Sequence, residues 1–339
     1  MKRALVLLAL ALGISPAGAA DTPAVLQRML EAARTLNYRG HVVQIEGQRT
    51  QTLELLHRAG HEAGEDRVRS LQGAYWELER SGSRCRVALG DARPTRDEAL
   101  VAAAFPSLLP RRLERLAAYY EFTLVGSGRL AGRPADFTVA RPRDEFRFGY
   151  LLGTDSDTGL LLKASLMDGQ GRVLRQAFFV DVEILPLLPD SVWEQAFEPA
   201  PVDRQWTEHT LQAAPLASGD LPWQIGTLPA GFRVDGYQRR RMPGSGQEVE
   251  QLTVSDGLAT VSVFIDATAP GEKALLGASR IEAVPVFGAQ VGDRHVTALG
   301  AAPVVTLRQI VEALTPVPQA SSETVVAPPA DAQPVEVAP

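Results

Sequence analysis

Hydrophobic and polar residues alternate along much of the chain, and this two-residue period is typical of β-strands with one buried face. The clearest stretch covers 146–184, where turns at 153–159 and at Asp168-Gly169 separate three alternating runs. The alternating apolar residues are Phe146, Phe148, Tyr150, Leu152, Leu160, Leu162, Ala164 and Leu166. Because short turns join antiparallel neighbours, the pattern predicts a three-stranded meander with one apolar face.

Similar runs precede this stretch. Val43 and Ile45 share one face of a predicted strand, and Leu53 and Leu55 continue the pattern after a turn at Gly47. Further strand-like runs are separated by Gly, Pro, Ser and Asp, and they cover 75–79, 85–89, 122–125 and 137–140. We expect these strands to pair in antiparallel fashion with their neighbours.

Three segments of the first half change to the spacing of helices. In 21–36, Pro23 stands at the first predicted helical position and apolar residues follow at helical spacing. The pattern Thr95-x-x-Glu98 is a capping box ahead of 99–105, and a second amphipathic helix covers 111–120. We expect the last two helices to form an insertion that lies across the sheet as a lid.

The order of these elements predicts an α+β first domain, 21–198, built on an open, curved antiparallel sheet. Proline, serine and glycine without any period make 199–221 a predicted linker. A smaller, mainly β domain is expected over 222–315. It contains hairpins at 249–266 and 284–299, which turn at Asp256-Gly257 and Gly292-Asp293, and a helix announced by the capping box Thr306-x-x-Gln309. Residues 316–339 are expected to be a disordered, Pro-rich tail.

The first twenty residues have the order of a secretory signal peptide: Lys2-Arg3, an apolar stretch over 4–14, and small residues over 17–20. We therefore expect 1–20 to be removed and the rest of the chain to be exported. Lysine and arginine number 34 against 40 acidic residues, so no basic field favours a nucleic-acid partner. Later segments contain no apolar run long enough to suggest a membrane span. The single cysteine, Cys85, is expected to be a buried thiol.

Catalytic and metal-binding patterns fail at the residues that such chemistry needs. Gly244-Ser245-Gly246 lacks the spacing of a nucleophile elbow. His57 and His61 have the spacing of metal ligands on a helix, but Arg58 stands where a metalloprotease carries its carboxylate. Asp155-x-Asp157-x-Gly159 begins like a calcium loop and lacks the closing Glu, so a polar hairpin turn is favoured. The sequence thus predicts a binding protein, not an enzyme, with no metal and no cofactor.

A curved sheet closed by helices leaves a crevice on its apolar face, and such a crevice suits an acyl chain or a hydrophobic peptide. A fully packed core is the alternative. The candidate lining residues come from the strands and from the insertion: Leu53, Leu55, Leu100, Phe105, Leu113, Leu116, Phe148, Tyr150, Leu160, Leu162 and Phe178.

Arginines cluster within 111–115, within 141–147 and at Arg239, Arg240 and Arg241. A guanidinium binds carboxylates and phosphates in bidentate fashion, so these clusters are candidates for contact with an acidic segment or a lipid phosphate. We take the third cluster as the candidate partner site. An ordinary solvated surface, paired with the acidic residues of the chain itself, is the alternative.

Three motifs resemble the RseB/MucB family. The first runs from Phe146-Arg147-Phe148-Gly149-Tyr150 through Thr158-Gly159-Leu160-Leu161-Leu162-Lys163 to Leu166-x-Asp168. The second joins Pro222-Trp223 to Leu228-Pro229-Ala230-Gly231-Phe232, and the third is the run from Ser255-Asp256-Gly257-Leu258 to Ile265. The likeness covers nearly all of the chain beyond the signal peptide and fades in 91–121 and in the tail.

This resemblance implies a half-barrel of the LolA/LolB kind with helices across its mouth, followed by a smaller β domain. It implies a periplasmic negative regulator of a sigma-E or AlgU-type envelope-stress sigma factor. Such a protein binds the periplasmic segment of an RseA/MucA-like anti-sigma factor, shields it from a site-1 protease, and is released by acyl lipid or lipopolysaccharide. A periplasmic lipid or lipoprotein carrier without a signalling role is the alternative, and a homo-oligomer is possible.

Overall fold

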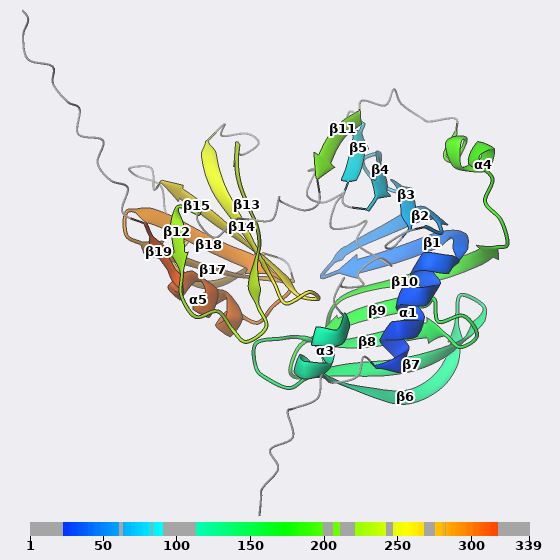
Figure 1. Cartoon of the computed structure of the whole chain (residues 1–339), viewed down its shortest axis with the longest axis horizontal. Coiled ribbons are helices and arrows are strands. Elements are labelled where there is room, and N and C mark those ends of the chain that lie inside the picture. The colour runs from blue at the N-terminus through cyan, green and yellow to red at the C-terminus, as the bar shows by residue number, and fades with distance from the viewer. Residues whose placement is uncertain are drawn as a thin grey trace, which may run out of the picture.

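The computed structural model describes residues 23–60, 64–82, 84–90, 113–198, 206–210, 221–241, 247–267, 275–281 and 283–317, which form two adjacent domains (Figure 1). The predicted signal peptide, the first helix of the predicted insertion, and the tail from 318 onward lie outside these residues. In the part that is described, no helix combines the length and the apolar character needed to cross a membrane.

The first domain is built on one antiparallel sheet of eleven strands. The strands are β1 (Asn37–Glu46), β2 (Arg49–Arg58), β3 (Glu65–Ser70), β4 (Trp76–Ser81), β5 (Arg84–Leu89), β6 (Tyr120–Leu130), β7 (Arg133–Pro142), β8 (Gly149–Asp155), β9 (Leu161–Met167), β10 (Val173–Leu185) and β11 (Trp206–Thr210). Their spatial order is β11-β5-β4-β3-β2-β1-β10-β9-β8-β7-β6. Since β11 and β6 do not pair with each other, the sheet is open, and the predicted fold class and the meander β8-β9-β10 are confirmed.

Two helices lie on the same side of this sheet (Figure 1). Helix α1 (Ala24–Thr35) starts after Pro23, whose carbonyl accepts the backbone N–H groups of Leu26 and Gln27, and it buries Leu26 and Met29 against the strands. Helix α3 (Leu113–Tyr119) ends one residue earlier than predicted, because Tyr120 already belongs to β6, and residues 111–112 lie outside the described part of the chain.

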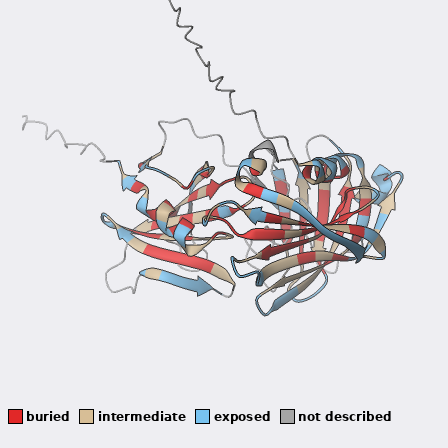
Figure 2. Ribbon diagram, turned by 90° about the horizontal axis from the view of Figure 1, so that it is seen from below, coloured by how far each residue is buried: buried red, intermediate tan, exposed pale blue. Residues whose placement is uncertain are grey.

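The core of the first domain lies between the inner face of the sheet and these helices, and Figure 2 shows its buried residues in red along the strands. One predicted inner residue is misplaced. Strand β10 has a bulge at Val180, because Phe179 pairs with Val42 and the next pair joins Asp181 to His41. The bulge turns Phe179 inward, with 1% of its surface exposed, and leaves Phe178 on the other face, where Lys163 Nζ lies 5.9 Å from its ring.

The chain leaves β10 along the outer face of the sheet. Helix α4 (Asp190–Glu194) and the residues around it bury Leu188 and Phe197 against Leu56 of β2. Strand β11 then pairs with the edge of β5. The predicted linker 199–221 therefore contains a strand, which the flanking prolines concealed in the sequence.

The second domain is a six-stranded antiparallel sheet of order β13-β14-β15-β18-β17-β16, packed against one helix. Its elements are β12 (Trp223–Ile225), β13 (Arg233–Arg241), β14 (Glu248–Ser255), β15 (Thr260–Ala267), β16 (Gly277–Ile281), β17 (Val284–Val291), β18 (Arg294–Gly300), α5 (Val304–Glu312) and β19 (Leu314–Pro316). Strands β12 and β19 form a separate two-stranded sheet. Both predicted hairpins, β14–β15 and β17–β18, are confirmed.

The predicted capping box at Thr306 is wrong. Helix α5 starts after Pro303, whose carbonyl accepts the backbone N–H groups of Thr306 and Leu307 at 3.0 and 3.2 Å. Proline is favoured at a helix start because its fixed φ suits the first turn. The Thr306 hydroxyl, fully buried, instead donates to the carbonyl of Phe146 in the other domain at 2.7 Å.

Candidate functional site

The two domains exchange apolar side chains where they meet. Phe146, in the connection between β7 and β8, packs against the core of the second domain, whereas Phe148 belongs to the core of the first. In return, Leu258 and Ala301 of the second domain pack against the first-domain core. The prediction that Phe146 shares one face with Phe148 is thus wrong, because strand β8 starts only at Gly149 and the residues before it form a turn.

Arg147 lies between these two exchanged sets and is fully buried. Its Nε donates to Asp256 Oδ2 at 2.6 Å, and neither side chain has any exposed surface. Its other nitrogens donate to the Asp144 carboxylate and to the carbonyl of Ala230. An arginine read from the sequence as part of a surface cluster is therefore the polar centre of the domain junction.

Two aromatic rings enclose the same guanidinium. Its Cζ lies 4.2 Å from the ring centre of Tyr119, the last residue of α3, and 4.9 Å from that of Phe232. The backbone comes close here as well. Gly231 has φ +84°, and a Cβ at this position would lie 2.5 Å from the Tyr119 ring and 2.8 Å from Arg147 Nη2, so only glycine fits.

Asp256 also shapes the turn that carries it. Its Oδ1 accepts the backbone N–H groups of Leu258 and Ala259 at 2.9 and 2.7 Å, while its Oδ2 accepts the hydrogen bond from Arg147. One carboxylate thus fixes the tip of the β14–β15 hairpin and ties it to the first domain. The residues that meet in this junction come from all three motifs on which the family resemblance rests.

An apolar cavity of about 20 Å³ lies beside the hairpin tip. It is lined by Leu26, Met29, Leu116, Phe122, Ala140, Tyr150, Leu152, Leu161, Ala164 and Leu258. Space of this size holds about one water molecule. This cavity is too small for an acyl chain as it stands. The acyl-binding role of the predicted lining residues stays a prediction.

The predicted acyl-lining residues fall into four groups. Leu116 and Tyr150 line the cavity. Five others are buried in the same core without lining it: Leu53, Leu55, Phe148, Leu160 and Leu162. Phe178 faces away, as described above. Leu100, Phe105 and the side chain of Leu113 lie outside the described part of the structure.

The predicted partner-binding arginines lie on β13, which is the last strand at one edge of the second sheet. Arg239 is exposed, and its Nε donates to the Tyr237 hydroxyl at 3.2 Å. That hydroxyl in turn donates to Glu250, which also accepts the indole N–H of Trp223. Only the backbone of Arg240 and Arg241 is described. Their role in partner binding stays a prediction.

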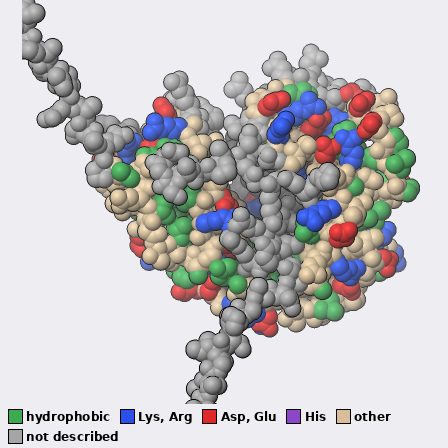
Figure 3. Space-filling model, in the orientation of Figure 1, with side chains coloured by type: hydrophobic (Ala, Val, Ile, Leu, Met, Phe, Trp, Pro, Cys, Tyr) green, Lys and Arg blue, Asp and Glu red, His purple; other side chains and the backbone are tan. Residues whose placement is uncertain are grey.

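A second candidate is a polar groove of about 280 Å³ on the outer face of the first domain. It is lined by Glu65, Glu79, Arg80, Ser81, Arg84, Cys85, Arg86, Trp193 and Glu208. Charges of both signs are mixed on the face shown in Figure 3. Arg86 pairs with Glu79, and its guanidinium also lies 4.5 Å from the ring of Trp206 on β11. These pairings hold strands together, so the groove carries little free charge for a ligand.

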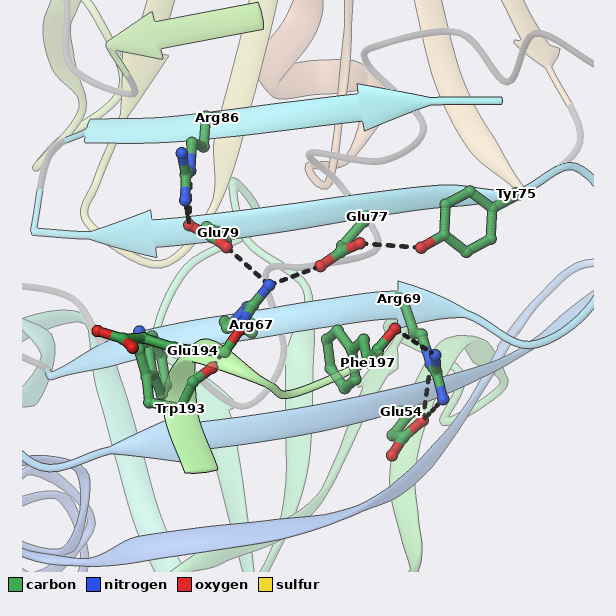
Figure 4. Close-up of polar contacts among 10 residues, drawn as sticks. All are labelled: Glu54, Arg67, Arg69, Tyr75, Glu77, Glu79, Arg86, Trp193, Glu194 and Phe197. Atoms are coloured by element: carbon green, nitrogen blue, oxygen red, sulfur yellow. Dashed lines mark hydrogen bonds and ion pairs between the residues drawn. The ribbon is translucent and has the colours of Figure 1, made fainter. Parts of the chain in front are cut away.

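The deepest part of this outer face is a structural network (Figure 4). Arg67 is 5% exposed and pairs with Glu77 and Glu79, each at 2.9 Å. Its Nη1 donates to the carbonyl of Trp193 at 2.5 Å, and Arg69 pairs with Glu54 and donates to the carbonyl of Phe197. The network thereby fastens the α4 segment onto β3 and β4.

The histidine considered as a metal ligand is structural too. His57 is buried, with Nδ1 2.7 Å from Asp66 Oδ1 and Nε2 2.9 Å from the carbonyl of Ala33, so it joins α1 to the sheet. His61 lies outside the described residues. Asp155 caps the β8–β9 turn by accepting the N–H and hydroxyl of Thr158. Within the described ranges, no three His, Cys, Asp or Glu side chains are grouped to hold a metal ion.

Comparison with known proteins relates both domains to one family. Residues 21–200 match the family profile of the MucB/RseB N-terminal domain, and residues 217–315 match that of the MucB/RseB C-terminal domain. The sigma factor AlgU regulatory protein MucB of Pseudomonas aeruginosa is 29% identical over 326 residues, which are 92% of this chain and 96% of that protein. The sigma-E factor regulatory protein RseB of Escherichia coli K12 is 25% identical over 260 residues, which are 75% of this chain and 79% of that protein.

Solved structures agree with this relationship. A crystal structure of MucB in complex with MucA(peri) superposes with a TM-score of 0.67 at 27% identity, covering 87% of this chain and 99% of that one. A crystal structure of MucB alone gives a TM-score of 0.63 at 27% identity, covering 88% of this chain and 99% of that one.

Proposed function

Because the chain belongs to the MucB/RseB family, we propose that it regulates an envelope-stress sigma factor by binding the periplasmic segment of a membrane-anchored anti-sigma factor. The relative seen in complex with MucA(peri) supports this partner class. The predicted signal peptide supports a periplasmic location. The protein acts by binding, not by catalysis.

The finer mechanism has two parts. The bound anti-sigma segment is shielded from a site-1 protease, and an acyl lipid or lipopolysaccharide weakens the complex, so that the segment becomes accessible. The observation that carries the proposal is the junction, where one buried network joins the apolar core of the first domain to the turn of the second. A ligand in that core can therefore alter a surface that both domains form.

The test uses the mature chain, residues 21–339, and a synthetic peptide with the periplasmic sequence of the anti-sigma factor encoded in the same genome. Calorimetry should show saturable binding, and the protein should slow cleavage of the peptide by the cognate site-1 protease. Dodecanoate or lipid A should lower the peptide affinity. Failure of the peptide to bind would refute the regulatory role.

The apolar inner face with its cavity also suits a lipid carrier without a signalling role. The same titrations separate the two functions. A carrier binds dodecanoate and shows no affinity for the peptide, whereas a regulator binds both and each ligand weakens the other.

A further inference from the structure

The tip of the β14–β15 hairpin, residues 255–260 and here called the hairpin tip, crosses the domain boundary. Its Leu258 is partly buried, packs against the first-domain core and lines the cavity. Among the described residues, the other lining side chains belong to the first domain. A side chain of the second domain thus occupies space that the first domain would otherwise offer to a ligand.

We propose that the hairpin tip is the resident plug of an acyl-chain site: Leu258 fills the mouth of the crevice, and the Asp256–Arg147 pair is the latch that keeps it there. An acyl chain and the docked second domain then compete for the same space. This inference rests on the proposed release by lipid and gives that release a physical route.

The first step of the argument is volume. A cavity of about 20 Å³ holds about one water molecule, so an acyl chain enters only if a lining group moves away. Strands and α1 contribute most of the lining, and their backbones are fixed by regular hydrogen bonds. Leu258 lies in a turn between strands and is supplied by the other domain, so its withdrawal leaves the first-domain fold intact.

The second step is connection. The Leu258 N–H donates to one oxygen of Asp256, and the other oxygen accepts the hydrogen bond from Arg147. Withdrawal of Leu258 therefore pulls the Asp256 carboxylate away from Arg147, which keeps only its pair with Asp144 of the same domain. A buried carboxylate that loses its charged partner is strongly unfavourable, so partial opening is disfavoured and the domains separate far enough for water to reach Asp256.

The third step is the lid. Tyr119 at the end of α3 covers one side of the Arg147 guanidinium, and Leu116 of the same helix lines the cavity. A chain that enters beside Leu116 disturbs the ring that encloses Arg147. Cavity, helix α3, Arg147 and the hairpin tip thus form one contiguous set of contacts.

The experiment measures lipid affinity and domain docking in the same full mature chain. Cys85 is replaced by Ser, and dyes are attached at Gln170→Cys in the first domain and Ser279→Cys in the second, both exposed positions. The probe is dodecanoate below its micellar concentration. In the parent protein, dodecanoate should lower energy transfer between the dyes, because the second domain undocks.

Leu258→Ala is the informative variant, and Leu276→Ala is its matched control, since Leu276 is 67% exposed in the same domain. Leu258→Ala opens the mouth without breaking the latch. It should bind dodecanoate at least about tenfold more tightly, or about 1.4 kcal/mol, with a smaller change in energy transfer. Asp256→Asn weakens the latch, so energy transfer should be lower before lipid is added. The control should match the parent.

The results distinguish failure of the plug from failure of the proposed release by lipid. If Leu258→Ala binds dodecanoate with the parent's affinity, or if the parent binds it without any change in energy transfer, the plug is refuted and lipid release by another route survives. If neither parent nor variants bind dodecanoate while the anti-sigma peptide still binds, lipid release itself is refuted. Circular dichroism confirms that each variant is folded.

Discussion

Replacing Arg147 by Met is expected to weaken domain docking by about 3–5 kcal/mol, because the change leaves a buried carboxylate without its charged partner. Neither Arg147 nor Asp256 has exposed side-chain surface. Methionine has a similar length and still fills the space between Tyr119 and Phe232. The substitution therefore removes the charge and the hydrogen bonds with little change in packing.

The magnitude follows from the groups left behind. The Asp256 carboxylate keeps two backbone N–H donors, from Leu258 and Ala259, which favours the lower end of that range. The carbonyl of Ala230 also loses the donor that Arg147 provides, but Ala230 is exposed and water replaces that donor at little cost. We therefore expect an effect of about 3 kcal/mol on docking.

Energy transfer between dyes at positions 170 and 279, followed during urea titration, reports docking separately from unfolding of each core. Arg147→Met should shift this transition to lower urea, and adding Asp256→Asn should restore part of the loss, since the stranded charge is then removed. Arg172→Met is the control: Arg172 is 68% exposed in its pair with Asp168, so an effect below about 1 kcal/mol is expected. A docking transition of Arg147→Met within about 0.5 kcal/mol of the parent, a typical surface effect, would refute the latch.

Three further predictions concern other contacts. Gly231→Ala should weaken docking by about 1–3 kcal/mol, measured by the same titration, because its φ of +84° is strained for alanine and the new Cβ meets an aromatic ring. Arg67→Met should destabilise the first domain by about 3–5 kcal/mol in thermal unfolding, because the Glu77 side chain has no exposed surface and loses its ion pair with Arg67. Burial raises the pKa of Asp155, but the hydrogen bonds from Arg133 and Thr158 lower it by more, so the pKa lies below its usual value. The ionised form therefore stabilises the fold above about pH 4, and the advantage of the parent over Asp155→Asn should be full at pH 7 and shrink as the pH falls below about 4.

Matched variants make these predictions specific. Gly169→Ala is the control for Gly231→Ala, because a Cβ at position 169 has open space around it, and it should leave docking unchanged. If Gly231→Ala weakens docking no more than Gly169→Ala does, the close approach of Gly231 to the Tyr119 ring is contradicted. Arg39→Met removes a 59% exposed arginine and should cost far less than Arg67→Met. Asp181→Asn is the control for Asp155→Asn, because it removes a carboxylate that is 60% exposed. If the difference in stability between these two variants stays constant with pH, the assigned charge state of Asp155 is contradicted.

Local patterns predict the strands and hairpins of this chain well, because alternation and turn chemistry act between near neighbours in sequence. The hairpin at Asp256-Gly257 is an example: a short polar residue and a glycine allow the tight turn that joins β14 to β15. The same reasoning misplaced Phe178. Residues 178, 180 and 182 follow the two-residue period of a regular strand, so nothing in the sequence marks the bulge. Only the pairing of β10 with β1 shows that Val180 is an extra residue.

The junction could not be derived from such patterns. Arg147 and Asp256 are 109 positions apart, and Thr306 is 160 positions from the carbonyl that it binds. The sequence placed Arg147 in a surface cluster because arginines are usually exposed. Its two apolar neighbours, Phe146 and Phe148, are the one local signal of burial, and they indicate burial without revealing that they enter different cores.

The composition of the junction bears on how readily it opens. A buried ion pair fixes geometry but adds little net stability compared with apolar packing, so docking depends mainly on the few exchanged apolar side chains. Burying one leucine side chain contributes about 1.5–3 kcal/mol. An acyl chain gains about 0.8 kcal/mol for each buried methylene, so about four methylenes match the contribution of Leu258. In the proposed mechanism, a lipid therefore needs only the end of one chain inside the crevice to displace the hairpin tip, while the latch makes the displaced domain leave the junction as a unit.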